Sequence, residues 1–299
     1  MSPKLGWGTY RVPHVASAAE TIIAAGCSWI DTAPNYAHGT AQTQLASVLA
    51  THPEVRVSTK VGFLTHSQAA EALAAGVIDA ETTATGHSIN PAYVSWQIDR
   101  SRAELGRDRP DIVFLHNPEH SYADRANLAY ALADAFRELE AAAADRRIKG
   151  YGVATWSGFA EGALSVPDLV SLASKAAGGQ SHHLTAIQLP VSLVNINPIA
   201  EALNGRGPLV EAAEAGLSTF VSSPLHGGEL PSLVDQELAD LVGPDLSPAQ
   251  AALAVLSGVP GIERALISTS RAAHWEDAAH AVSMQVPRSI TRKVVDVLA

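Results

Sequence analysis

Residues 30–36 of the chain read Ile-Asp-Thr-Ala-Pro-Asn-Tyr, and two further short apolar runs also end in polar side chains. Val-Ser-Thr-Lys occupies residues 57–60, and Phe-Leu-His-Asn occupies residues 114–117. Each run has the length and the apolar character of a buried strand. If the strands belong to one open β/α barrel, the residues that close them meet at one rim, where such barrels form their active sites.

The rest of the chain repeats this alternation of strand and helix. Short β-rich runs alternate with alanine-rich helical stretches, and we find no shift in composition or linker that would divide the chain. Eight such alternations predict a parallel sheet closed into a (β/α)8 TIM barrel, an α/β fold. We therefore expect one barrel domain over residues 1–299. The expected strands lie near 4–8, 28–31, 56–61, 111–115, 149–154, 185–190, 217–222 and 262–267, and the expected helices near 16–25, 40–50, 91–105, 123–146, 166–176, 206–215, 235–257 (with a break), 272–283 and 287–298.

One connection is too long for a simple strand-to-helix link. Residues 64–88 contain an alanine run and the segment Thr-Thr-Ala-Thr-Gly-His. We expect this stretch to be a decorated loop above the barrel mouth. Long loops in this position usually carry specificity.

Three residues that close the expected strands, and a tyrosine in the loop after the first of them, have complementary chemistry. Asp31, Tyr36, Lys60 and His116 supply an acid, a phenol, an amine and an imidazole. A lysine beside a tyrosine lowers the pKa of the phenol, and an aspartate holds the lysine charged and in place. Each residue alone has a structural explanation, such as a helix cap, a solvated lysine or a core histidine. Their joint order along the chain favours a site that delivers a proton to a carbonyl oxygen.

With these residues in place, the sequence resembles the aldo-keto reductase family over nearly its full length. Asp31-Thr32-Ala33 followed by Tyr36 is similar to the family's second-strand signature. The resemblance implies that Tyr36 is the general acid, that Lys60 and Asp31 tune it, and that His116 orients the substrate carbonyl and shares in proton transfer. The other matching segments are Leu5-Gly6-Trp7-Gly8-Thr9, Ser58-Thr59-Lys60, Leu115-His116, Gly150-Tyr151-Gly152-Val153, Gln188 and Ser223-Pro224-Leu225.

The resemblance also implies a nicotinamide cofactor, which is NADP(H) by family habit, although the residues do not exclude NAD(H). Gln188 would hold the carboxamide. Arg271 and the helix N-terminus at Ser270 could bind a phosphate, and the alternative for Arg271 is a plain solvated cation. Two positions depart from the family pattern: Thr155 replaces an asparagine, and Ser222 replaces the aromatic ring that stacks on the nicotinamide. The implied cofactor-binding residues are Thr9, Arg11, Asp31, Thr155, Gln188, Ser222, Ser223, Leu225, Ser268, Thr269, Ser270 and Arg271.

The expected substrate is a polar, hydroxylated aldehyde or ketone, a class that includes sugar-like compounds, because Asn117 places an amide where the family often has an aromatic ring. Aromatic residues near the strand ends would wall the pocket. The expected substrate-binding residues are Trp7, Tyr10, His87, Asn117 and Trp156.

These departures leave three functions open. The first is an NAD(P)H-dependent reductase or dehydrogenase with rearranged cofactor contacts. The second is a redox-neutral lyase, dehydratase or isomerase on the same scaffold, since the four residues can move protons without a hydride. The third is a non-catalytic nucleotide-binding subunit. The presence of all four acid–base residues argues against this third function.

The composition of the chain limits its expected binding partners and its expected cellular compartment. A net charge of −10 argues against nucleic acid and anionic membranes as partners, and no stretch approaches the roughly 18 apolar residues of a membrane span. The single cysteine, Cys27, excludes an internal disulfide and favours a reducing cytoplasm. His182-His183 has no carboxylate at ligand spacing, so we expect no metal. We expect a cytoplasmic monomer or weak homo-oligomer.

Overall fold

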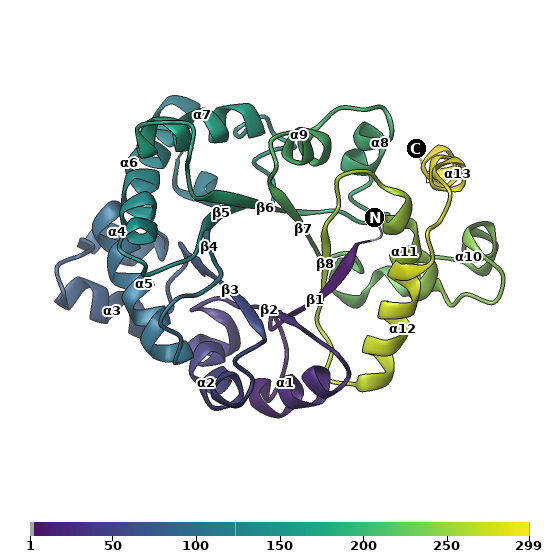
Figure 1. Cartoon of the computed structure of the whole chain (residues 1–299), viewed down its shortest axis with the longest axis horizontal. Helices are drawn as coiled ribbons and strands as arrows, with labels where there is room; N and C mark the ends of the chain where they lie inside the picture. Colours follow the sequence, from purple (N-terminus) through teal and green to yellow (C-terminus); the bar gives the residue numbers. More distant parts are fainter. Residues whose placement is uncertain (1–2, 123, 299) are drawn as a thin grey trace.

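Eight parallel strands close into a barrel in sequence order in the computed structural model, which describes residues 3–122 and 124–298 (Figure 1). The barrel closes where β1 pairs with β8, with Lys4 opposite Arg264 and Trp7 opposite Ile267. The expected α/β barrel is therefore confirmed, and every expected strand is found close to its expected position. The strands are β1 (Lys4–Gly8), β2 (Trp29–Asp31), β3 (Arg56–Val61), β4 (Ile112–His116), β5 (Tyr151–Ala154), β6 (Leu184–Pro190), β7 (Ser218–Ser222) and β8 (Arg264–Ile267).

Helices surround the ring of strands in the view down the barrel (Figure 1). Several of them begin where the sequence provides a cap: Asn90 accepts a hydrogen bond from the backbone N–H of Tyr93, and Ser247 forms a capping box with Gln250. The second cap splits the stretch expected near 235–257 into two helices. The helices are α1 (Val15–Ala24), α2 (Ala41–Thr51), α3 (His66–Ala74), α4 (Ala80–Thr85), α5 (Pro91–Leu105), α6 (Arg125–Ala144), α7 (Val166–Ala177), α8 (Asn197–Leu203), α9 (Pro208–Glu214), α10 (Gln236–Val242), α11 (Pro248–Val255), α12 (Ala272–Ser283) and α13 (Arg288–Leu298).

The long connection after β3 is more regular than the expected loop, because it contains α3 and α4. A capping box between Thr65 and Gln68 starts α3, and the side chain of Asp79 caps α4. The segment then returns to the barrel, where Phe63 and His87 form an isolated antiparallel bridge. We call residues 64–88 the β3–α5 excursion. It rejoins the barrel beside the end of β3, which brings His87 close to the strand ends.

Large side chains fill the inside of the barrel. Trp29, Phe114 and Phe220 are buried there, and Phe220 packs against Trp29 at a tilt and against Phe114 edge to face. Gly152 makes room for them, since a Cβ at that position would lie 2.6 Å from the Phe114 ring. Arg264, at the amino end of β8, is only 4% exposed and lies 4.8 Å from the centre of the Trp29 ring. Within the described ranges, no helix has both the length and the apolar character needed to cross a bilayer.

Candidate active site

A cavity of about 930 Å³ opens at the carboxyl ends of the strands. Strand-end residues from around the barrel line it, including Asp31 of β2, His116 of β4, Gln188 of β6 and Ser222 of β7. This is the end at which barrels of this class place their active sites. The volume is within the range of small-molecule and cofactor sites.

A buried ion pair lies beneath this cavity. The Lys60 ammonium donates to Asp31 Oδ2 at 2.5 Å and to the backbone oxygen of Thr32 at 3.0 Å, and both charged side chains are buried. Burial alone would lower the pKa of Lys60, but the Asp31 carboxylate and the Tyr36 hydroxyl together raise that pKa above its ordinary value. The lysine is therefore charged at neutral pH. Asp31 Oδ1 is held in turn by the Ser58 hydroxyl at 2.8 Å and the Gln188 amide at 3.3 Å.

Tyr36 lies next to this pair, in the cavity wall. The Lys60 ammonium is 5.0 Å from the centre of the Tyr36 ring. Burial raises the pKa of the Tyr36 phenol, and the charge of Lys60 opposes the rise without overcoming it. Lys60 thus lowers the pKa of the phenol as expected, but desolvation outweighs this effect, and the resulting pKa lies above its ordinary value. The phenol stays protonated at neutral pH, which is the state that can donate a proton.

His116 ends β4 and lies against Tyr36. The two ring centres are 6.1 Å apart and the rings are nearly perpendicular, at 83°. Burial, reinforced by the charge of Lys60 and by His87, lowers the pKa of His116 well below its ordinary value. The imidazole is therefore neutral near pH 7, when it can orient a carbonyl by a hydrogen bond but does not act as a cationic acid.

Thr155 lies in the cavity wall, but its hydroxyl already has two partners. It donates to Glu119 Oε1 at 2.5 Å and accepts from the backbone N–H of Gly158 at 2.7 Å. The hydroxyl proton of Thr155 is thus bonded to Glu119 and is not available to a cofactor amide. The Thr-x-x-Gly spacing from residue 155 to residue 158 is the signal that sequence reasoning missed, because a threonine hydroxyl often caps a turn in this way.

The loop between β8 and α12 forms the far end of the cavity. Residues 268–271 all line it, and Arg271 is exposed. The first turn of α12 begins Ala-Ala-His, and no side-chain bond caps its N-terminus within the described residues. Uncapped N–H groups beside an arginine form an environment that suits a phosphate. Arg11, Ser223 and Leu225 also line this cavity.

Three residues expected in the site lie behind the cavity wall. Trp7 is fully buried, and its indole N–H donates to the backbone oxygen of Thr269 at 2.7 Å, so it supports the β8–α12 loop. Thr9 is also buried, with its hydroxyl 2.8 Å from that of Thr32. His87 is buried against the backbone of His116. For these three residues the structure favours support of the site over direct contact with a ligand.

The lining of the cavity also combines exposed rings with amides. Tyr10 and Trp156 line it and are 50% and 52% exposed, so both rings offer an open face. Asn117 lines it as expected, and Asn35 is an addition that sequence reasoning missed although it directly precedes Tyr36. The buried Oδ1 atom of Asn35 has no hydrogen-bond partner among the described residues. The four side chains suit a ligand with both hydroxyl groups and apolar ring faces.

Other candidate groups lack such an arrangement. Cys27 is buried, and burial raises the pKa of its thiol to about 11, which makes it a poor nucleophile. The His183 ring is paired with Glu140 Oε2 at 2.6 Å. No group of three or more histidine, cysteine, aspartate or glutamate side chains in the described part of the chain is placed to hold a metal ion.

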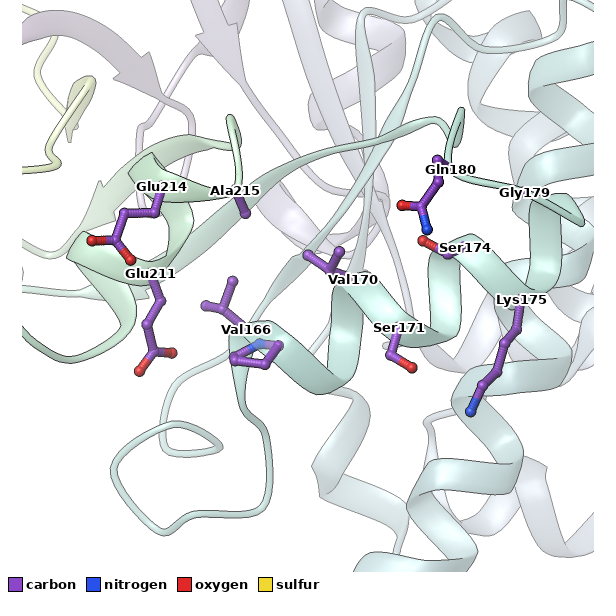
Figure 2. Close-up of a pocket in the computed structure, with 11 residues that line it drawn as sticks. Val166, Val170, Ser171, Ser174, Lys175, Gly179, Gln180, Glu211, Glu214 and Ala215 are labelled. Carbon is purple, nitrogen blue, oxygen red and sulfur yellow. The ribbon is translucent and has the colours of Figure 1, made fainter.

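A second hollow, of about 680 Å³, lies on the outside of the barrel between α7 and α9 (Figure 2). Val166 and Val170 of α7 face Glu211 and Glu214 of α9 across it. Its lining mixes aliphatic and hydroxyl side chains with Lys175, Glu211 and Glu214. Among the described residues it lacks the tyrosine and histidine found at the barrel mouth.

Comparisons with known proteins agree with this architecture. Residues 1–240 match the model of the aldo/keto reductase family. A D-threo-aldose 1-dehydrogenase of a Pseudomonas species is 32% identical over 171 residues, which cover 50% of this chain and 49% of that protein. The chain thus spans about half the length of that curated relative.

Solved structures share the fold at low sequence identity. An aldo/keto reductase from Klebsiella pneumoniae, in complex with NADP and acetate, has a TM-score of 0.68 at 18% identity and covers 99% of this chain and 92% of its own. A second Klebsiella pneumoniae aldo-keto reductase, in complex with NADPH, has a TM-score of 0.70 at 17% identity, with 100% and 95% coverage. The holo form of an aldo-keto reductase from Bacillus halodurans has a TM-score of 0.70 at 16% identity, with 99% and 92% coverage. Together with the family match over residues 1–240, the site described above places this chain in the aldo/keto reductase family.

Proposed function

We propose that this protein is an NADP(H)-dependent oxidoreductase that interconverts a small hydroxylated aldehyde or ketone with the corresponding alcohol. The observation that carries the proposal is the buried Asp31–Lys60 pair behind Tyr36, in the same cavity as a neutral His116. Membership of the family supports it, as do the NADP and NADPH complexes of the two Klebsiella pneumoniae relatives.

The cavity wall has residues that could bind both the nicotinamide part and a phosphate of a nicotinamide dinucleotide. The Gln188 amide lies beside Asp31 and could hold a carboxamide, while Arg271 and the uncapped start of α12 could hold a phosphate. Ser222, at the end of β7, offers no ring for stacking. When bound, the reduced cofactor would supply the hydride for the carbonyl carbon.

Tyr36 would supply the proton that balances this transfer. Its phenol is protonated at neutral pH and would give its proton to the carbonyl oxygen as that oxygen gains negative charge. The phenolate left behind would be stabilised by the Lys60 ammonium, which Asp31 holds in place. His116 would orient the carbonyl as a neutral hydrogen-bond donor. A positioned general acid of this kind contributes about 10²–10⁴-fold in rate.

The substrate end of the cavity favours an aldose-like compound. The amides of Asn35 and Asn117 can bind hydroxyl groups, and the open faces of Tyr10 and Trp156 can cover the apolar faces of a sugar. The D-threo-aldose 1-dehydrogenase among the relatives supports this substrate class.

A second function is favoured by two observations in the cavity wall. Thr155 has its hydroxyl committed to Glu119, and Ser222 provides no stacking ring, so the cofactor contacts are fewer than the acid–base groups would suggest. The same Tyr36 and His116 could catalyse a redox-neutral dehydration or isomerisation of a hydroxylated carbonyl compound.

Titration with NADPH and NADH, followed by assays of NADPH oxidation with aldoses, separates the two functions. We expect NADPH binding and aldose-dependent oxidation. Arg271→Ala should weaken NADPH binding about 10- to 100-fold, from the 1.5–3 kcal/mol of a charge-assisted hydrogen bond, and should leave NADH binding unchanged. Arg288→Ala, an exposed site on α13, is the matched control. No binding at millimolar cofactor would exclude the oxidoreductase and leave the redox-neutral function.

A further inference from the structure

His87 is a buried histidine whose two ring nitrogens are both engaged. It is 2% exposed, with Nε2 at 2.9 Å from the backbone oxygen of His116 and Nδ1 at 2.8 Å from Ser121 Oγ. Because a carbonyl oxygen only accepts hydrogen bonds, Nε2 must carry a proton. Burial lowers the pKa of His87 to about 4, so near neutral pH its Nδ1 accepts from the Ser121 hydroxyl. The two neighbours therefore fix one neutral tautomer of the ring.

The contact between His87 and β4 is closely packed. The Phe63 ring lies 4.8 Å from the His87 ring and 5.0 Å from the His116 ring, measured between centres. The backbone N–H of Ser88 donates to the oxygen of Gly62 at 3.0 Å. A Cβ at Gly62 would lie 2.6 Å from the His116 oxygen and 2.9 Å from His87 Nε2. Glycine at this position is what allows the imidazole to reach the carbonyl.

The carbonyl that His87 binds belongs to the peptide unit between His116 and Asn117. Asn117 has a left-handed backbone with φ of 47°, and its N–H donates to the oxygen of Ala154 at 2.6 Å. The peptide unit is thus held at its N–H by β5 and at its oxygen by His87. Since its orientation sets the direction of the side chains on either side, both His116 and Asn117 depend on these two bonds.

We propose that His87 is a positioning residue: its neutral imidazole clamps the His116–Asn117 peptide unit and so makes the β3–α5 excursion a determinant of where the substrate oxygen is bound. This inference rests on the proposed function of the cavity, in which His116 orients the carbonyl. It also explains why His87 lies behind the cavity wall. The β3–α5 excursion contributes to the site through this backbone contact, while no residue of its helices α3 and α4 lines the cavity.

Two substitutions separate the bond to His116 from the bond to Ser121. The amide nitrogen of glutamine can take the place of Nε2, so His87→Gln keeps a donor for the His116 oxygen. Asparagine reaches only as far as Nδ1, so His87→Asn keeps contact with Ser121 alone. His66→Gln makes the same chemical change at an exposed position of the excursion and serves as the control.

We expect His87→Asn to lower kcat for NADPH-dependent aldose reduction about 10- to 100-fold, as a misplaced catalytic group does, while the Kd for NADPH stays unchanged. His87→Gln should recover most of this loss, and His66→Gln should behave like the unsubstituted protein. Hydrogen exchange measured by NMR should show faster exchange at the Asn117 amide in His87→Asn, with the core strands still protected.

The hydrogen-exchange measurement does not require turnover. The proposed role of His87 and the proposed function of the protein can therefore fail separately. Absence of turnover in the unsubstituted protein would refute the proposed function, while faster exchange at Asn117 in His87→Asn alone would still support the clamp. Equal kcat and equal Asn117 protection in the Asn and Gln variants would overturn the clamp. A loss of protection throughout the chain in both variants, with a lowered Tm, would also overturn it, in favour of a general packing role.

Discussion

The hydroxyl of Thr155 donates to Glu119 Oε1 at 2.5 Å and thereby ties the turn after β5 to the turn after β4. The same hydroxyl accepts from Gly158. Thr155, which the family pattern would assign to the cofactor, thus forms hydrogen bonds within the cavity wall.

We expect Thr155→Val to lower the free energy of unfolding by about 1–3 kcal/mol, because the half-buried Glu119 carboxylate and the backbone N–H of Gly158 each lose a partner. The affinity for NADPH should not change. Denaturant unfolding and isothermal calorimetry measure the two quantities on the same preparation. A variant of normal stability with weakened NADPH binding would instead mean that Thr155 contacts the cofactor.

Ser222→Tyr should strengthen cofactor binding, because it returns a ring to the end of β7, in the cavity wall. Base–aromatic stacking is worth about 1–3 kcal/mol, which corresponds to roughly one to two decades in Kd. Fluorescence titration with NADPH is the measurement, and Ser222→Ala, which changes the side chain without adding a ring, should show no gain. Equal Kd values for the Tyr and Ala variants would count against a nicotinamide at this position.

Tyr36→Phe and Lys60→Met should both abolish turnover but should differ in stability. Tyr36→Phe removes only the hydroxyl that gives the proton, so the fold and the NADPH affinity should be retained. Lys60→Met leaves the buried Asp31 carboxylate without its cation, which costs about 3–5 kcal/mol when a buried pair is broken. Steady-state kinetics and thermal unfolding of the two variants test this contrast. Normal turnover in Tyr36→Phe would assign the proton to another group.

Acid stability should depend on His87. Its pKa of about 4 in the folded chain lies below the ordinary value of 6.5, so between these pH values the unfolded chain binds a proton that the folded chain does not. The stability is thus complete above pH 6.5 and is lost as the pH falls towards 4. At 1.36 kcal/mol per pH unit the loss is on the order of 3 kcal/mol.

His87→Gln removes this titration, so its stability should fall less steeply than that of the unsubstituted protein over the same range. Urea unfolding at a series of pH values from 7 to 4 measures the difference. His116 titrates in both proteins, and burial, the main cause of its lowered pKa, is common to both. Parallel stability curves would mean that the pKa of His87 is the same in the folded and the unfolded chain.

The sequence predicted the barrel and the meeting of Asp31, Lys60 and His116 because both follow from local pattern. Period, length and turn residues locate each strand, and the parallel arrangement then brings the strand ends to one rim. The break between α10 and α11 was also predictable, since Ser247-Pro248 is a helix start. The capping box at Thr65 could have located α3, and Asn197-Pro198 could have located α8.

What the sequence did not predict depends on contacts between distant segments. The assignment of Thr155 to the cofactor overlooked Glu119, which is 36 residues away. The net shift in the pKa of Tyr36 depends on how far the barrel excludes water, and spacing along the chain carries no measure of that. Trp7 was expected in the pocket because strand alternation does not say which of two neighbouring residues faces the mouth. Its partner, Thr269, is 262 residues further along the chain.

The pairing of β1 with β8 has a consequence for synthesis on the ribosome. The first strand, Lys4–Gly8, finds its second neighbour only when Arg264–Ile267 has been made. Until then the nascent sheet has two open edges, and open edges are sites for pairing with other chains. A chain released before β8 would keep both edges, so premature termination should yield aggregates and not a smaller folded protein.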